Sequence, residues 1–305
     1  KVSNPSSVFI TDVEVEIGGQ KIDKQTGHWM NTWAELTEPN PTGETTDQTA
    51  IATGTLFQRM SGMGGCAVHS ATNQDRLIIP LQFWFCRNPG LALPLIALQY
   101  HEVKVILNHK ASTTTTWTTA PTDNKLWCDY IYLDTDERRR FAQVSHEYLI
   151  EQIQEYTSGT DKTIDLNFNH PVKELVWTGA WKPGYAISTT PSGASTYLLK
   201  LNGHDRFAAR DYRYFTRTQV WGHHSGAGGL GAATDAVVPV AGGSGTFNDS
   251  IGVYSFALKP EEHQPSGTCN FSRIDNAQLI IGASGAIHTI FAVNYNVLRI
   301  MSRMG

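Results

Sequence analysis

Residues Val8–Ile17 read VFITDVEVEI, and apolar side chains alternate with polar ones through most of this stretch. A period of two places Val13, Val15 and Ile17 on one face, as in a strand that buries one side. The dipeptide Gly18-Gly19 follows and is a strong turn signal. This stretch therefore predicts a β-strand that ends at a tight turn.

The same pattern recurs along most of the chain. Further strands are expected at Leu77–Phe85, His101–Leu107, Leu126–Leu133, Ile164–Phe168, Val172–Trp177, Tyr197–Leu201, Val253–Leu258, Ala277–Ile281 and Thr289–Ile300. His146–Thr157 fits a helix or a strand by periodicity. Recurring strands and turns favour an all-β sandwich, and jelly rolls and immunoglobulin-like folds both fit at this level.

Few segments predict helices. His28–Leu36 has large apolar residues at helical spacing. A second short helix is expected within Asp134–Ala142, where Asp134 or Thr135 could cap it and the acids precede the arginines, as the helix dipole prefers. The glycine-rich segment Gly222–Gly245 is expected to be a surface loop.

Composition bounds the class of protein. The 305 residues allow two domains of ordinary size. The formal net charge is -4, which argues against binding to nucleic acid, because phosphate binding needs a basic surface. No apolar run reaches the roughly 18 residues of a membrane span. The four cysteines are widely spaced without a CxxC motif, which predicts buried free thiols rather than disulfides or a zinc site.

A weak internal repeat suggests a duplicated domain. Three landmarks recur in the same order, matching Gly19 with Gly203, Phe83 with Phe256, and Tyr130 with Tyr295. The expected seam lies near Asp136–Ser145, giving domains 1–140 and 141–305. The second copy has a longer stretch ahead of its first landmark. We therefore expect the first sandwich to lack about two strands at its N-terminus, which would leave an open edge of the kind that natural proteins avoid.

Longer motifs carry a family resemblance over nearly the whole chain. In the first half they are EIGGQKIDK at 16–24, PLQFWFCRNPGLALP at 80–94, LQYHEV at 98–103 and YLDTDERRRFA at 132–142. In the second half they are LNGHDRF at 201–207, YSFALKPEEHQPSG at 254–267 and FAVNYNVLR at 291–299. These motifs resemble the major capsid protein of the nucleocytoplasmic large DNA viruses, especially the algal-virus and iridovirus-like branch.

The resemblance implies two tandem jelly-roll β-sandwiches, a double jelly roll whose first sandwich is incomplete at its N-terminus. It implies a structural protein and not an enzyme, without cofactors, that forms homotrimers of pseudo-hexagonal outline in the icosahedral shell of a large DNA virus. The implied partners are further copies of the chain, neighbouring capsomers and minor capsid proteins, with an internal viral membrane nearby. The implied location is the virion, after assembly in the host cytoplasm.

Some groups of histidines and carboxylates could suggest a metal site or an active site, but we interpret them as structural. His223 and His224 are adjacent, without the His-x-His spacing of metal-binding jelly rolls, so we interpret them as loop histidines. Asp134, Asp136 and Glu137 could be carboxylates for glycoside hydrolysis. Three arginines follow them directly, so salt bridges at a domain junction explain them better. No catalytic or metal-binding residue is therefore predicted.

Two segments are candidates for contacts between protomers. One is the apolar run LALPLIAL at 91–98, from which we select Leu91, Leu93, Leu95 and Ile96. A buried crossover within one domain is the alternative for this run.

The other segment, Glu261–Gly267, follows the turn signal Lys259-Pro260. Its residues Glu261, Glu262 and His263 could be imagined as an acid–base group. An exposed or interface loop is the better interpretation, and we predict a contact role for all three.

Two sequons, at Asn248 and Asn270, are possible glycosylation sites.

Two other functions stay open. A carbohydrate-binding or hydrolytic sandwich would need exposed aromatic side chains beside acids. Its candidates are Trp29, Trp33, Trp84, Trp177 and Trp181, which would support sugar binding if exposed in a row and would be core residues if buried. A minor capsid or vertex protein is the other alternative.

Overall fold

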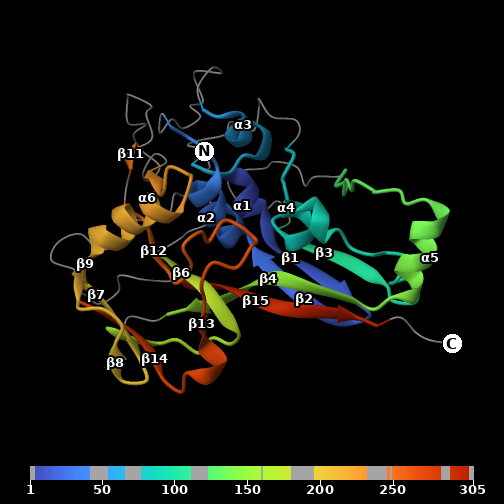
Figure 1. Ribbon diagram of the computed structural model, residues 1–305. Helices are drawn as coiled ribbons and strands as arrows, with labels where there is room; N and C mark the ends of the chain where they lie inside the picture. The colour runs from blue at the N-terminus through green and yellow to red at the C-terminus, as the bar shows by residue number, and fades with distance from the viewer. Residues whose placement is uncertain are drawn as a thin grey trace.

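The computed structural model describes residues 4–41, 54–65, 77–110, 123–158, 161–179, 196–231, 246–247, 249–282 and 289–301. Two sheets of the second half pack face to face, and a smaller sheet with several short helices forms the first half (Figure 1). Among the described residues, no helix combines the length and apolarity that crossing a membrane requires.

The second half forms the sandwich that the strand pattern predicts. One sheet has the order β12-β6-β15-β4, formed by β12 (Ile251–Ser255), β6 (Pro171–Thr178), β15 (Thr289–Ile300) and β4 (His146–Thr157), with β13 (Cys269–Asn270) also on β6. The other has the order β5-β14-β7-β8, formed by β5 (Thr163–Asp165), β14 (Ala277–Ile281), β7 (Thr196–Leu201) and β8 (His204–Asp205), with β9 (Arg210–Asp211) also on β7. These pairings are antiparallel.

The sheet that contains β15 is apolar on both faces. The β15 residues Ile290 and Ala292 belong to the core between the two sheets, while Phe291 and Val293 belong to a cluster on the opposite face. The period of two in a strand separates the two sets. The sheet that contains β15 is therefore a middle layer, with the sandwich core on one side and helix α2 (Gly27–Thr37) on the other.

Helix α2 covers that second face, and it confirms the helix predicted at His28–Leu36. The side chain of Thr26 accepts a hydrogen bond from the Trp29 backbone N–H at 3.1 Å and caps the helix. Trp29, Trp33 and Leu36 then pack in one cluster with Phe291. A helix from the first half is thereby fixed on a sheet of the second half.

The described first half contains a three-stranded sheet of order β2-β1-β3, formed by β2 (Gln20–Thr26), β1 (Ile10–Ile17) and β3 (Val103–His109). Val13, Val15 and Ile17 are buried, as their alternation predicts. Their core cluster also includes Ile150 of β4 and Ile300 of β15. The short elements of this half are α1 (Pro5–Phe9), α3 (Leu56–Ser61), α4 (Trp84–Arg87) and the 3-10 turn η1 (Pro89–Leu91).

Five further elements complete the second half. They are the π-helix η2 (Tyr214–Gln219), α6 (Val220–His223), the pair β10 (Leu230–Gly231) and β11 (Thr246–Phe247), and the 3-10 turn η3 (Phe271–Arg273). Helix α5 (Thr135–Gln143) lies between β3 and β4 in the chain and stands at one edge of the molecule (Figure 1).

The first landmark of the repeat is confirmed as a matched pair of hairpins. Gly18 and Gly19 connect β1 to β2 with φ of 59° and 80°. Asn202 and Gly203 connect β7 to β8 with φ of 51° and 78°. Two consecutive positive φ angles suit the right-handed twist of the flanking strands, which explains why glycine recurs at the second position.

Two strand predictions are wrong. Leu77–Phe85 is not a strand, because residues 77–83 are irregular and α4 begins at Trp84. Its apolar character reflects burial without strand pairing, since Phe83 and Trp84 are buried in the first core and Pro80 has no N–H for a ladder. Leu126–Leu133 has no regular structure either, and no described strand pairs with it.

The predicted thiols are free but not buried as expected. Cys86 and Cys128 are exposed and Cys269 is half-buried. Cys66 lies outside the described residues. Burial of a thiol depends on its neighbours in space, and wide spacing in the sequence carries no information about those neighbours.

Candidate functional site

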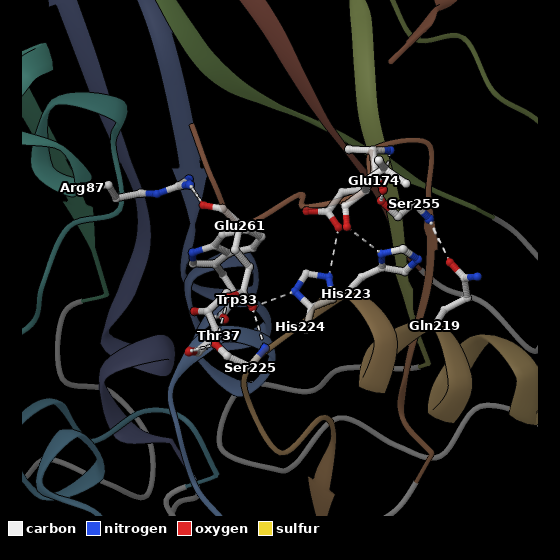
Figure 2. A network of polar contacts seen from close by, with 12 residues as sticks. Trp33, Thr37, Arg87, Glu174, Gln219, His223, His224, Ser225, Ser255 and Glu261 are labelled. Carbon is white, nitrogen blue, oxygen red and sulfur yellow. Dashed lines mark hydrogen bonds and ion pairs between the residues drawn. The ribbon is translucent and has the colours of Figure 1, made fainter. Parts of the chain in front are cut away.

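The most elaborate polar site is centred on His224, whose side chain is completely buried. Its Nε2 lies 3.0 Å from Glu174 Oε2, and its Nδ1 lies 3.1 Å from Glu261 Oε1 (Figure 2). Burial opposes a charged imidazole, but the two carboxylates, Glu174 above all, outweigh it and raise the pKa of His224 to about 9. The site is thus an imidazolium held between two carboxylates.

Three segments supply these groups. Glu174 lies on the middle-layer strand β6, His224 follows α6, and Glu261 follows β12. Ser225 strengthens the junction, because its backbone N–H donates to Glu261 Oε1 at 2.8 Å. Its hydroxyl oxygen lies 2.8 Å from both Glu261 Oε2 and the carbonyl oxygen of Thr37, at the end of α2. The loop after β12 is therefore tied to α2 and to α6.

A second ionic cluster surrounds Glu151 of β4. Lys173 Nζ lies 2.7 Å from Glu151 Oε1, Arg87 Nη1 lies 2.9 Å from Oε2, and His263 Nδ1 lies 3.5 Å from Oε1. Burial would raise the pKa of Glu151, but His263, Lys173 and Arg87 together lower it to about 2. Glu151 is therefore an ionised carboxylate surrounded by cations.

Arg87 connects the two clusters. Its Nη2 donates to the carbonyl oxygen of Glu261 at 3.5 Å, and its guanidinium lies 4.9 Å from the centroid of the Trp33 ring (Figure 2). Lys173 lies 5.3 Å from the centroid of the Tyr295 ring, whose hydroxyl donates to the carbonyl oxygen of His263 at 3.0 Å. The combined network spans α4, β4, β6, β15 and the loop after β12.

This arrangement suits a structural role. The carboxylates of the network are paired with cations inside the protein, and such clusters fix relative geometry when every charge is compensated. The described part of the chain contains no group of three or more His, Cys, Asp or Glu side chains that could hold a metal ion.

The structure corrects the interpretation of the adjacent histidines. His223 is the last residue of α6, and His224 is buried between carboxylates instead of lying in a surface loop. Within the segment predicted as a loop, residues 222–223 are helical, residues 230–231 form β10, and residues 232–245 lie outside the described residues. The glycines suggested a loop, but the apolar residue Val220 anchors the preceding helix in a core cluster.

In the loop predicted to contact another protomer, only some of the side chains are exposed. Glu261 points inward to His224 and Ser225, and His263 is half-buried near Glu151. Glu262 is exposed and forms an ion pair with Lys259 at 2.9 Å.

The apolar run at 91–98 divides in the same way. Leu91 and Leu93 pack partly buried against the first core, and Leu98 is buried in it, as expected of a crossover within the domain. Leu95 is 46% exposed and Ile96 is half-buried. Leu95 and Ile96 therefore keep surface that another protomer could cover.

The acidic run at the start of α5 has a capping role. Asp134 accepts hydrogen bonds from the backbone N–H groups of Asp136 and Glu137 at 3.1 and 3.0 Å. No residue of this helix is buried. The predicted helix and its cap are confirmed, and among the arginines Arg139 lies 4.0 Å from Asp136.

The tryptophans do not form a sugar-binding row. Trp29, Trp33, Trp84 and Trp177 are buried core residues, and Trp181 lies outside the described residues.

Asn248 also lies outside the described residues. Asn270 is half-buried in β13, where its side chain accepts a hydrogen bond from the Ser272 N–H at 3.1 Å.

Comparisons with known proteins converge on one family. Residues 137–305 match the family model for the large eukaryotic DNA virus major capsid protein, and residues 2–134 match the model for the major capsid protein N-terminus. The major capsid protein of Pyramimonas orientalis virus is 48% identical over 97% of this chain and 75% of its own length. That of Paramecium bursaria Chlorella virus 1 is 36% identical over 99% of this chain and 79% of its own length.

A solved structure agrees. A chain of the quasi-atomic model of the PBCV-1 virus capsid superposes with a TM-score of 0.73 at 34% identity, covering 100% of this chain and 84% of that chain.

Proposed function

The chain belongs to the family of large eukaryotic DNA virus major capsid proteins, and from this premise we propose that it assembles into homotrimeric capsomers of pseudo-hexagonal outline. It is a structural component of the virion and not an enzyme, and its fold is the double jelly roll. The similarity to a chain of an assembled virus capsid over the whole of this chain carries the proposal.

Two sandwiches in each chain give the proposed capsomer its outline. We propose that they comprise residues 1–140 and 141–305, a division supported by the two family models, which meet between residues 134 and 137. Three copies around a closed axis would then present six similar sandwiches. Closed symmetry makes the contacts between protomers identical.

The buried network supports this role physically. A rigid contact surface favours assembly, because ordering a mobile loop on assembly costs free energy. His224 and Ser225 hold Glu261, so the loop that carries Glu262 and His263 is fixed before any partner arrives. We propose that this loop, together with Leu95 and Ile96, contacts a neighbouring protomer, and that Leu91 and Leu93 support the contact from beneath.

The wider surroundings follow from the same family membership. We propose that neighbouring capsomers and minor capsid proteins bind this subunit, that an internal viral membrane lies near the assembled shell, and that assembly takes place in the host cytoplasm. The net charge of -4 supports a role without direct nucleic-acid binding. Glycosylation of Asn248 or Asn270 stays a prediction, which mass spectrometry of tryptic peptides from virions would test.

Substitution at Ile96 tests the trimer. Ile96→Asp places a charge on the half-buried residue of the proposed contact and is expected to abolish the trimer in sedimentation velocity. Val144→Asp is the control, since Val144 is 48% exposed and outside the proposed contact. Circular dichroism of both variants separates lost assembly from lost folding. A folded Ile96→Asp variant that still sediments as a trimer would remove this residue from the contact.

A further inference from the structure

Two buried carboxylates of the first half each receive a backbone N–H from the second half. Asp23 of β2 is 4% exposed, and its Oδ1 accepts a hydrogen bond from the N–H of Ile153 in β4 at 3.2 Å. Glu35 of α2 is 3% exposed, and its Oε2 accepts a hydrogen bond from the N–H of Leu230 in β10 at 2.8 Å. The same type of contact thus joins the halves at two separate places.

Both contacts lie within larger seams. At the first, Gln152 donates from its side chain to the carbonyl oxygen of Ile22, and Thr26 donates to Glu155 Oε2 at 2.9 Å, so β2 lies along the edge of β4. At the second, the N–H groups of Gly226 and Gly228 donate to the carbonyl oxygens of Leu36 and Glu35 at 2.7 and 3.0 Å. Each carboxylate therefore lies within a set of hydrogen bonds that joins the two halves.

Neither carboxylate has an ion-pair partner among the described residues. Around Asp23 the other hydrogen-bond donors are the Gln25 amide, at 3.2 Å, and the Lys24 backbone N–H. Three charged side chains are nearby: Arg87 acts on Asp23 only through space, Lys24 is paired with Asp12 and Glu14, and Glu155 adds a second acid on the facing strand. Around Glu35 the second donor is the Asn31 amide, at 2.8 Å, and no charged side chain shifts its titration.

We propose that the seam between the two halves is a proton-sensitive joint, closed while Asp23 and Glu35 are protonated and loosened as they ionise. A buried carboxylate without a cation is unfavourable, whereas the neutral acid still accepts the N–H bond through its carbonyl oxygen. The joint would therefore weaken as the pH rises.

The pKa values of Asp23 and Glu35 set the pH range over which the joint loosens. Burial raises the pKa of Asp23 to about 7 against the opposing effects of its donors and Arg87, and burial raises the pKa of Glu35 to about 7. An acid with a raised folded pKa stabilises the fold below its unfolded pKa, and the contribution is lost as pH rises through the folded value. For these groups the loss extends from about pH 4 to about pH 7.

Hydrogen exchange at the two donor amides tests the joint. In the unmodified chain, the protection of the Ile153 and Leu230 amides, corrected for intrinsic exchange, is expected to fall at least about tenfold between pH 5 and pH 8. The Leu199 amide, inside the second sandwich, is the internal reference. Constant protection at the donor amides relative to Leu199 would overturn the proposal.

Isosteric variants assign the effect to the carboxylates. Asp23→Asn and Glu35→Gln keep the acceptor oxygen but cannot ionise, so each is expected to remove the pH dependence at its own donor amide only. Glu137→Gln, on the exposed helix α5, is the matched control and should leave both profiles unchanged. Persistence of the pH dependence in the Asp23→Asn/Glu35→Gln double variant would also overturn it. If a variant does not fold, the exchange profile of the unmodified chain still decides.

Discussion

Lys173 donates to Glu151 at 2.7 Å, and the side chains of the two residues are 0% and 4% exposed. Lys173 lies on β6 and Glu151 on β4, and β15 runs between these two strands in the middle sheet, so the pair links strands that are not directly hydrogen-bonded to each other. Burial lowers the pKa of the lysine, while the carboxylate opposes that shift. A compensated buried pair of this type is worth little net stability, yet removing one member is costly.

Lys173→Met is accordingly expected to destabilise the chain by about 1.5–3 kcal/mol, because Glu151 loses one charge-assisted hydrogen bond inside the protein while Arg87 remains beside it. Urea unfolding followed by fluorescence measures the change. Lys259→Met, which breaks the exposed pair with Glu262, is the control and should cost less than about 1 kcal/mol. Equal effects of the two substitutions would show that burial of the Lys173 pair has no energetic consequence.

The raised pKa of His224 leads us to predict that the stability of the fold falls at alkaline pH. Its folded pKa, about 9, lies above the ordinary value of 6.5, so its contribution is fully present below pH 6.5 and is lost as pH rises to about 9. The loss is expected to be of the order of 3 kcal/mol. Chemical unfolding at pH 6.5 and pH 9 measures it.

His224→Gln is expected to remove this alkaline slope and to lower stability at neutral pH, because Glu174 and Glu261 are left without their cation. His109→Gln is the control, since His109 is exposed on β3. A slope between pH 6.5 and pH 9 that survives in His224→Gln would assign the titration to another group.

At Gly252 of β12 we predict that there is no room for a side chain. A Cβ at this position would lie 2.3 Å from Nε1 of Trp177, which is 1% exposed and packs against Tyr197 and Phe215. Gly252→Ala is therefore expected to cost about 1–3 kcal/mol through overpacking. Gly222→Ala is the control, because nothing lies within 4 Å of a Cβ there. Thermal unfolding compares them, and matched midpoints would contradict the packing argument.

Local sequence patterns predicted much of the second sandwich. Strands β6 and β15 are largely apolar because both faces of the middle sheet are buried, whereas β7 and β14 alternate because every second residue faces the sandwich core. The predicted ranges of all four strands agree with the structure to within about two residues, the usual ambiguity of element boundaries. The cap of α5 was predictable because Asp134 and the amides that it binds are adjacent in the chain.

The polar network could not be predicted in this way. Glu174, His224 and Glu261 come from distant parts of the chain, and no spacing rule joins them. Glu261 lies after a turn signal and was expected to face outward, yet the fold brings it to a buried histidine. The strand prediction for Leu77–Phe85 failed for a related reason, since an irregular segment that packs partly against a core can be as apolar as a strand.

The oligomeric state of the protein decides whether the chain forms trimeric capsomers. Sedimentation velocity, with electron cryomicroscopy of the same sample, is predicted to show a particle of three times the chain's mass with a pseudo-hexagonal outline along its axis. A protein that stays monomeric at concentrations where related capsid proteins assemble, or that forms a closed particle of another symmetry, would contradict the account.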